Sequence, residues 1–257
     1  MNIPKIQLLN NSYNITNNGS VPFQGSKTLT ADTFSTTNPY QQNSYSSLED
    51  KILASLLPEK FIAKHTNIEL FNKALTNKSI MELLKENNIQ PQINISNINS
   101  IIKSHLIPTK DYALLIMRNS GKNFTQKDYE IMTQAALLHD IGKALIPDKI
   151  LNKVEKLTAK ERTIIELHNE LGYKILQLDK INPEVRELIK NHHNYFGKTT
   201  NSELSQILTI ADRFSALKEN RPYKKAMSNE KAFQILYDGA KQGDYNKFYV
   251  DVLTKNV

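Results

Sequence analysis

The 257-residue chain contains no cysteine and no tryptophan. Without cysteine it can form neither a disulfide nor a thiolate metal site, so any bound metal must be held by His, Asp or Glu. The absence of cysteine also fits a reducing compartment. No stretch reaches the roughly 18–20 apolar residues that span a bilayer, and the first residues lack the long apolar core of a signal peptide. We therefore expect a cytoplasmic protein with no membrane segment.

Clustered charge of one sign is also missing. The chain has 33 Lys and Arg against 26 Asp and Glu, a net charge of +7, and its lysines are spread throughout. A positive surplus can attract anionic partners such as nucleotides. No basic stripe interleaved with aromatic residues is present, however, so a nucleic-acid-binding role is not expected.

Period-2 alternation, which is typical of strands, is not sustained in any window. Residues 1–48 hold eight Asn and thirteen Ser or Thr but only three charged side chains, and we expect a disordered tail there. The helical spacing of apolar residues over 49–94 predicts a small segment of two to four short helices. Residues 95–257 predict an all-α domain. Its expected helices cover 96–106, 110–120, 125–145, 158–178, 182–196, 203–220 and 228–241.

Histidine is concentrated in this predicted helical domain. Five of the six histidines lie within its apolar helical patterns, as do two aspartates: His105, His139, His168, His192, His193, Asp140 and Asp212. Any one of them alone is best explained as a hydrogen-bonded core residue. Together they would leave many buried polar groups in need of partners, which a pair of divalent metal ions would provide. Nitrogen and oxygen ligands suit iron, manganese or zinc. The sixth histidine, His65, is assigned no role.

The stretch ALLHDIGKALIPDKIL, residues 136–151, places charged side chains inside an apolar run. On a continuous helix His139 and Asp140 would point about 100° apart. The carboxylate could then bridge two metal ions while the imidazole binds one of them. Lys143 would lie one turn beyond His139 on the same face, where it could hold a substrate phosphate.

Several motifs occur together in one order. HDIGK, IPDKIL, LTAKERTIIELHNELGYKIL, the double histidine and ILTIADRFSALKENRPYKKAM follow one another over residues 95–257. This arrangement resembles the HD superfamily of metal-dependent phosphohydrolases and, within it, the HD-GYP subfamily of bacterial cyclic dinucleotide phosphodiesterases. The resemblance implies an HD-type helical bundle. It also implies metal-dependent hydrolysis of cyclic di-GMP, a related cyclic dinucleotide or another nucleotide.

The resemblance also implies roles for individual residues. Asp140 and Lys143 would act in catalysis, and Lys143, Arg221 and Lys224 would contact the substrate phosphates. The implied ligands of two divalent metal ions are His105, His139, Asp140, His168, His192, His193 and Asp212.

The chain departs from the HD-GYP pattern at three places. HHNYFGKTTNSE stands where the subfamily has HHExxDGxGYP, so Asn194 replaces the Glu and the GYP loop is missing. Ser215 replaces the second Asp of the AD-xx-DAL motif. Ile101 stands where members with three metal ions have a Glu, so the pattern favours two ions.

These departures leave two alternatives to an enzyme. The chain could be a catalytically inactive signalling or binding module that retains the metal core. It could also be one domain of a larger regulatory assembly, with a protein partner recruited through the N-terminal region.

Overall fold

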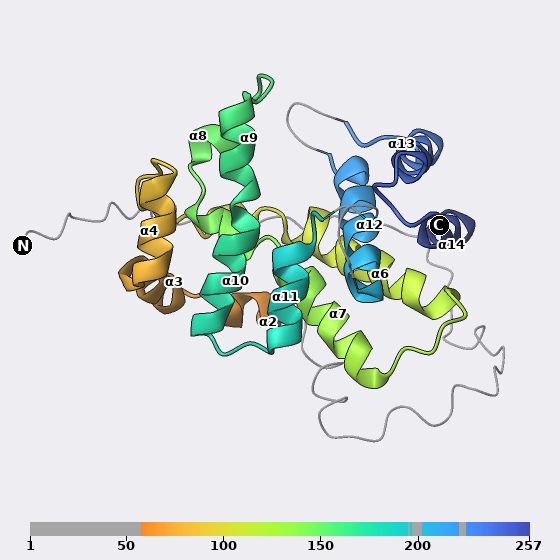
Figure 1. Cartoon of the computed structure of the whole chain (residues 1–257), viewed down its shortest axis with the longest axis horizontal. Coiled ribbons are helices and arrows are strands. Elements are labelled where there is room, and N and C mark those ends of the chain that lie inside the picture. Colours follow the sequence, from red (N-terminus) through yellow and green to blue (C-terminus); the bar gives the residue numbers. More distant parts are fainter. Residues whose placement is uncertain (1–57, 195, 197–201, 221–224) are drawn as a thin grey trace, which may run out of the picture. The chain divides into compact units, whose positions relative to one another are not determined.

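The computed structural model describes residues 58–194, 196, 202–220 and 225–257. Every regular element in these ranges is a helix, which confirms the predicted all-α fold class (Figure 1). None of these helices combines the length and the apolar character that a bilayer crossing requires. The predicted tail, residues 1–48, lies outside the described residues, and its boundary stays a prediction.

The helical elements follow one another with short connections. In chain order they are α2 (Pro58–His65), α3 (Ile68–Thr76), α4 (Lys78–Glu86), α5 (Ser96–Asn99), the π-helical turn η1 (Ile102–Leu106), α6 (Ile107–Asn119), α7 (Gln126–Leu138), the 3₁₀-helical turn η2 (Ile141–Leu145), α8 (Asp148–Leu151), α9 (Ala159–Glu166), α10 (His168–Leu178), α11 (Pro183–Asn191), α12 (Glu203–Lys218), α13 (Asn229–Lys241) and α14 (Lys247–Asn256).

The hairpin of α6 and α7 lies at the centre of the bundle (Figure 1). Helix α12 packs across both of its helices, α11 packs on α7, and α10 packs on α11 and η2. Helices α13 and α14 pack on each other and cover α12 and α6. Buried Leu, Ile, Ala and Phe side chains from these elements join in one apolar cluster, and each fully buried Leu, Ile or Phe contributes about 1.5–3 kcal/mol.

The N-terminal helices pack on this same core. Helix α2 contacts α7, and α3 contacts α10. His65, at the end of α2, is buried and its Nδ1 lies 2.5 Å from Asp179 Oδ2 just after α10. The sequence offered no signal for this contact because its two residues are 114 positions apart.

Capping boxes begin two helices that lead to the histidines. The Thr125 hydroxyl accepts from the Asp128 N–H and the Asp128 carboxylate accepts from the Thr125 N–H, which starts α7. Thr158 and Glu161 start α9 in the same way. Lys153 and then the Thr158 N–H and hydroxyl lower the pKa of Glu161 from 4.5 to about 2, because all of them stabilise the carboxylate.

Candidate metal centre

Three of the histidines lie at helix ends, whereas the sequence predicted that they would lie inside continuous helices. The predicted helices over 125–145, 158–178 and 182–196 are each interrupted near a histidine. Helix α7 ends at Leu138, directly before His139. Helix α9 ends at Glu166, two residues before His168, and α11 ends at Asn191, directly before His192.

Each of these rings donates its Nδ1–H to the main-chain carbonyl three residues earlier. The distances are 2.9 Å from His139 to Ala136, 2.6 Å from His168 to Ile165, and 2.6 Å from His192 to Ile189. Carbonyls in the last turn of a helix have no N–H partner within that helix, so the imidazoles supply one. With Nδ1 protonated, Nε2 of a neutral ring carries a lone pair and can bind a metal.

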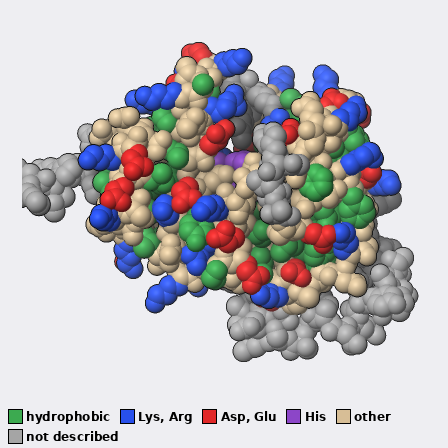
Figure 2. Space-filling view, in the orientation of Figure 1, with side chains coloured by type: hydrophobic (Ala, Val, Ile, Leu, Met, Phe, Trp, Pro, Cys, Tyr) green, Lys and Arg blue, Asp and Glu red, His purple; other side chains and the backbone are tan. Residues whose placement is uncertain are grey.

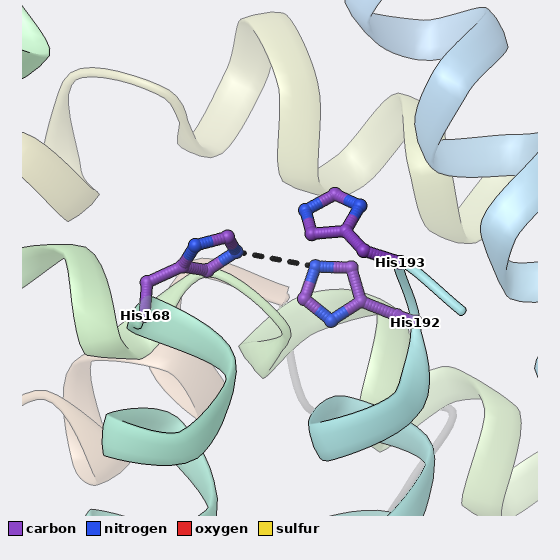
Figure 3. A group of neighbouring side chains, drawn as sticks. All are labelled: His168, His192 and His193. Carbon is purple, nitrogen blue, oxygen red and sulfur yellow. Dashed lines mark hydrogen bonds between the residues drawn. The ribbon is translucent and has the colours of Figure 1, made fainter. Parts of the chain in front are cut away.

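The first group, which we call the His168 cluster, consists of His168, His192 and His193 (Figure 3). The rings of His168 and His192 come from α10 and the end of α11 and meet through their Nε2 atoms at 3.3 Å. Both are buried, whereas the His193 side chain is 43% exposed. The cluster is therefore open to solvent on the His193 side.

The second group, which we call the His105 cluster, consists of His105, His139, Asp140 and Asp212. His105 Nε2 lies 3.0 Å from Asp212 Oδ1 and 3.2 Å from His139 Nε2. His139 Nε2 is 3.5 Å from the same Asp212 oxygen. These ligand atoms come from η1, the end of α7 and α12, so only the packed bundle brings them together.

Asp140 belongs to the His105 cluster and also faces the His168 cluster. Its Oδ1 is 3.3 Å from His168 Nε2, and its Oδ2 is 3.5 Å from His105 Nε2 and 3.6 Å from His139 Nε2. One carboxylate thus faces both groups, as a bridging ligand would. Asp212 also reaches both, since its Oδ2 lies 3.7 Å from His193 Nδ1.

The position of Lys143 differs from the predicted one. It lies in η2, beyond the end of α7, so it does not share a continuous helical face with His139. Its Nζ instead donates to Asp140 Oδ2 at 2.6 Å, because residues three apart eclipse each other in a 3₁₀ turn. The ammonium group is therefore next to the two clusters, and its side chain is 21% exposed.

Gly142 allows η2 to lie directly against α10. A Cβ at this position would stand 2.0 Å from the His168 carbonyl oxygen and 2.8 Å from the Gly172 nitrogen. The sequence contained this glycine within HDIGK but gave no reason to assign it a role. The structure shows that it permits the close approach of Asp140 to His168.

Both carboxyl groups of the centre are ionised. Burial by itself would raise the pKa of Asp140, but the charge of Lys143, followed by His139, lowers it, and that pKa lies well below its usual range. Burial likewise would raise the pKa of Asp212, but the imidazoles of His105 and His139, whose Nε2 atoms lie 3.0 Å and 3.5 Å from Asp212 Oδ1, lower it well below its usual range.

The imidazoles of the His168 cluster are neutral. Burial lowers the pKa of His168 to about 3 and that of His192 well below its usual value. The half-exposed His193 is only partly buried, and its pKa is lowered to a lesser degree. His139 behaves differently. Burial would lower its pKa, but Asp140 and Asp212 outweigh burial and raise it.

The contact between His168 and His192 shows whether the site suits a cation. Both rings are neutral and both Nδ1 protons are donated to carbonyls, so two Nε2 lone pairs face each other at 3.3 Å. Asp140 Oδ1 adds a third acceptor at 3.3 Å from His168 Nε2. Buried acceptors without a donor are unfavourable. The donor set is therefore compatible with a divalent metal ion.

The predicted site residues thus divide into two sets. The seven predicted metal ligands and Lys143 converge in the bundle, although their roles stay predictions. Arg221 and Lys224 lie outside the described residues. Figure 2 shows histidine side chains through an opening in the surface on this face of the molecule.

A family model described as "HD domain" matches residues 109–247 of the chain. The match confirms the resemblance to HD proteins. It includes Lys143, Arg221, Lys224 and all the predicted metal ligands except His105, which lies just before it.

Curated relatives match shorter parts of the chain. A cyclic di-GMP phosphodiesterase response regulator, RpfG of Xanthomonas campestris, is 32% identical over 44% of this chain and 33% of its own length. A cyclic di-GMP phosphodiesterase of Vibrio cholerae is 25% identical over 68% of this chain and 42% of its own length. A 3'3'-cGAMP-specific phosphodiesterase 2 of V. cholerae is 33% identical over 41% and 22%. The chain thus spans less than half the length of these relatives.

One solved structure also resembles the chain, the HD domain of L. monocytogenes phosphodiesterase PgpH in complex with cyclic-di-AMP. It is 17% identical, with a TM-score of 0.46, and the match covers 62% of this chain and 93% of that one.

Proposed function

Because the chain belongs to the HD domain family, we propose that it is a metal-dependent phosphohydrolase. The observation that carries the proposal is the acceptor-only contact between His168 and His192, with Asp140 facing both clusters. We propose that the ligands of two divalent ions are the members of the His105 and His168 clusters, and that Asp140 bridges them. Iron or manganese are the proposed metals, and zinc is an alternative.

The protein residues would bind and orient these ions and the substrate. When bound, two such ions would lower the pKa of a water molecule and polarise a phosphoryl oxygen. The carbonyl contacts hold the rings of His139, His168 and His192 in place, so these three ligands do not have to reorient. Lys143 would neutralise charge on the non-bridging phosphate oxygens, and Arg221 and Lys224 would do so from the RPY segment.

We propose a phosphodiester of a cyclic dinucleotide, or of another nucleotide, as the substrate. The names of the curated relatives support this class, since they include cyclic di-GMP and 3'3'-cGAMP phosphodiesterases. The missing GYP loop favours one alternative, a signalling or binding module that keeps the metal core but has lost turnover.

The test compares the wild type with Asp140→Asn. Both proteins are purified without oxygen from cells supplied with iron and manganese, and metal content is measured by elemental analysis. Hydrolysis is measured with bis-nitrophenyl phosphate, cyclic di-GMP, 3'3'-cGAMP, cyclic di-AMP and mononucleotides. Asp238→Asn is the matched control, because it makes the same change on the exposed face of α13.

The expected result is two metal ions and hydrolysis of at least one phosphodiester by the wild type and by Asp238→Asn. Asp140→Asn should lose the bound metal and the hydrolysis. A wild type without metal would refute the proposal. A wild type with two metals and no hydrolysis would support the binding module, and hydrolysis of mononucleotides alone would place the chain among the general HD phosphohydrolases.

A further inference from the structure

His105 is held differently from the three histidines that follow helix ends. It lies in η1, which continues directly into α6, so no helix ends beside it. The carbonyl three residues earlier, that of Ile102, accepts from the Ile107 N–H of the π-helical turn. His105 Nδ1 does not make the carbonyl contact that orients His139, His168 and His192, and it faces Ser215 instead.

A serine hydroxyl occupies the corresponding place. Ser215 on α12 is 1% exposed, and its Oγ lies 3.0 Å from His105 Nδ1 and 3.0 Å from the His105 carbonyl oxygen. A hydroxyl has one proton to donate. When that proton goes to the carbonyl, the ring must donate its Nδ1–H to Oγ, and Nε2 is left with its lone pair.

For a neutral His105 ring, the two possible tautomers have opposite consequences for a metal. With the proton on Nδ1, the Nε2 lone pair of His105 faces His139 Nε2 at 3.2 Å and Asp212 Oδ1 at 3.0 Å. If Ser215 instead donated to Nδ1, Nε2 would carry a proton toward Asp212. That proton would occupy the position of a cation.

We propose that Ser215 is a positioning residue that holds His105 as the Nδ1–H tautomer and so makes its Nε2 available as a metal ligand. The inference rests on the proposed function, because it requires a metal at the His105 cluster. It also explains why serine works in this buried position. Serine accepts a hydrogen bond from Nδ1–H without adding a third carboxylate beside Asp140 and Asp212, and it donates to the carbonyl, which a carboxylate cannot do.

The test measures how tightly each of two Mn²⁺ equivalents binds to the whole chain, by competition with a chromogenic chelator. In Ser215→Ala one equivalent should bind about 10–100-fold more weakly, because loss of an outer hydrogen bond to a ligating histidine has that effect. The other equivalent should be unchanged. Ser215→Cys keeps the shape of the side chain, although sulfur is somewhat larger, and it accepts poorly, so it should show the same loss. Ser215→Thr keeps a hydroxyl that can accept from Nδ1–H and donate to the carbonyl, so it should bind both equivalents as the wild type does.

Two further measurements separate positioning from packing. Histidine ¹⁵N spectra of the metal-free protein in EDTA, with His105 assigned from His105→Gln, should show one Nδ1–H tautomer in the wild type and a mixture in Ser215→Ala. Thermal melts in EDTA should be similar for both proteins. Thr133→Ala is the matched control, since its hydroxyl bonds only the Tyr129 carbonyl within α7 at 2.7 Å, and it should change neither Mn²⁺ equivalent.

The outcomes are distinct. Unchanged binding of both equivalents in Ser215→Ala would refute the inference and leave the proposed function intact. Equal weakening of both, with a lower melting temperature in EDTA, would show a packing role and also refute it. A wild type that binds no Mn²⁺ would overturn the proposed function and this inference together.

Discussion

Gly142→Ala tests how closely η2 must approach α10. The added Cβ would lie 2.0 Å from the His168 carbonyl oxygen, whereas an ordinary contact is at least 3.4 Å. Both neighbours that it meets first are main-chain atoms, so no side chain can rotate away. The two segments must therefore separate by about 1.4 Å, the difference between these distances.

This separation is large on the scale of a metal site. Asp140 Oδ1 and His168 Nε2 are 3.3 Å apart, and a shift along the line between them would bring them to about 4.7 Å. Two ligands with bonds of about 2.2 Å can be at most about 4.4 Å apart across one metal ion. We therefore expect Gly142→Ala to lose metal from the His168 cluster.

The same change should lower stability. Overpacking costs about 1–3 kcal/mol, and a clash between main-chain atoms belongs at the upper end. A loss of about 3 kcal/mol in a protein of this size lowers Tm by roughly 6–12 °C. Urea unfolding and thermal melts in EDTA measure this effect apart from the metal, and elemental analysis after loading with Mn²⁺ measures the metal.

Gly172→Ala is the matched control on α10. Its Cβ would meet Ile189 Cγ2 at 3.2 Å and Ile141 Cγ2 at 3.4 Å, which are side-chain atoms that can move. The gain in helix propensity, up to about 1 kcal/mol, offsets part of this crowding, so stability should change by less than about 1 kcal/mol. If Gly142→Ala were as stable as Gly172→Ala and kept its metal, the close approach would not position Asp140.

Three other changes test the rest of the chain. His65→Ala should cost about 1–3 kcal/mol in urea unfolding, because Asp179 loses its partner, and an unchanged midpoint would show that the contact does not join α2 to α10. Glu161→Gln should lower Tm above about pH 4.5, and the difference in Tm from the wild type should shrink as pH falls toward 2, because a carboxylate with a lowered pKa stabilises the fold only while it is ionised. Glu155→Gln is the control. A difference in Tm that does not depend on pH would contradict the capping role. Deleting residues 1–45, whose composition predicts disorder, should leave Tm nearly unchanged, and a fall of many degrees would contradict that prediction.

The sequence by itself determined the fold class and the chemistry of the ligands. A 3.6-residue apolar period is a local property, so it predicted helices over most of residues 95–257 without knowledge of their partners. The absence of cysteine restricted any metal ligands to His, Asp and Glu. The order of HDIGK, IPDKIL and ADRFSAL indicated the HD family, which the family match confirmed.

Only the tertiary structure decided where the helices stop and which side chains meet. The apolar periodicity of the sequence continues through His139, His168 and His192, because it depends only on which positions are apolar. It does not show that each imidazole donates to a carbonyl at the end of a helix. Lys143 pairs with Asp140 because the chain changes to a 3₁₀ turn after α7, a change that no local pattern announced.

The contact between Ser215 and His105 joins residues 110 positions apart, so only the packing of α12 on η1 creates it. The tautomer of His105, and with it the availability of a ligand atom, depends on a hydroxyl that in the sequence was only a departure from a motif. Local sequence thus specifies which groups can bind a metal. The packing of separate helices specifies which ring nitrogen of each histidine is available, because a hydrogen-bond partner from another element or from the end of a helix fixes the position of the imidazole proton.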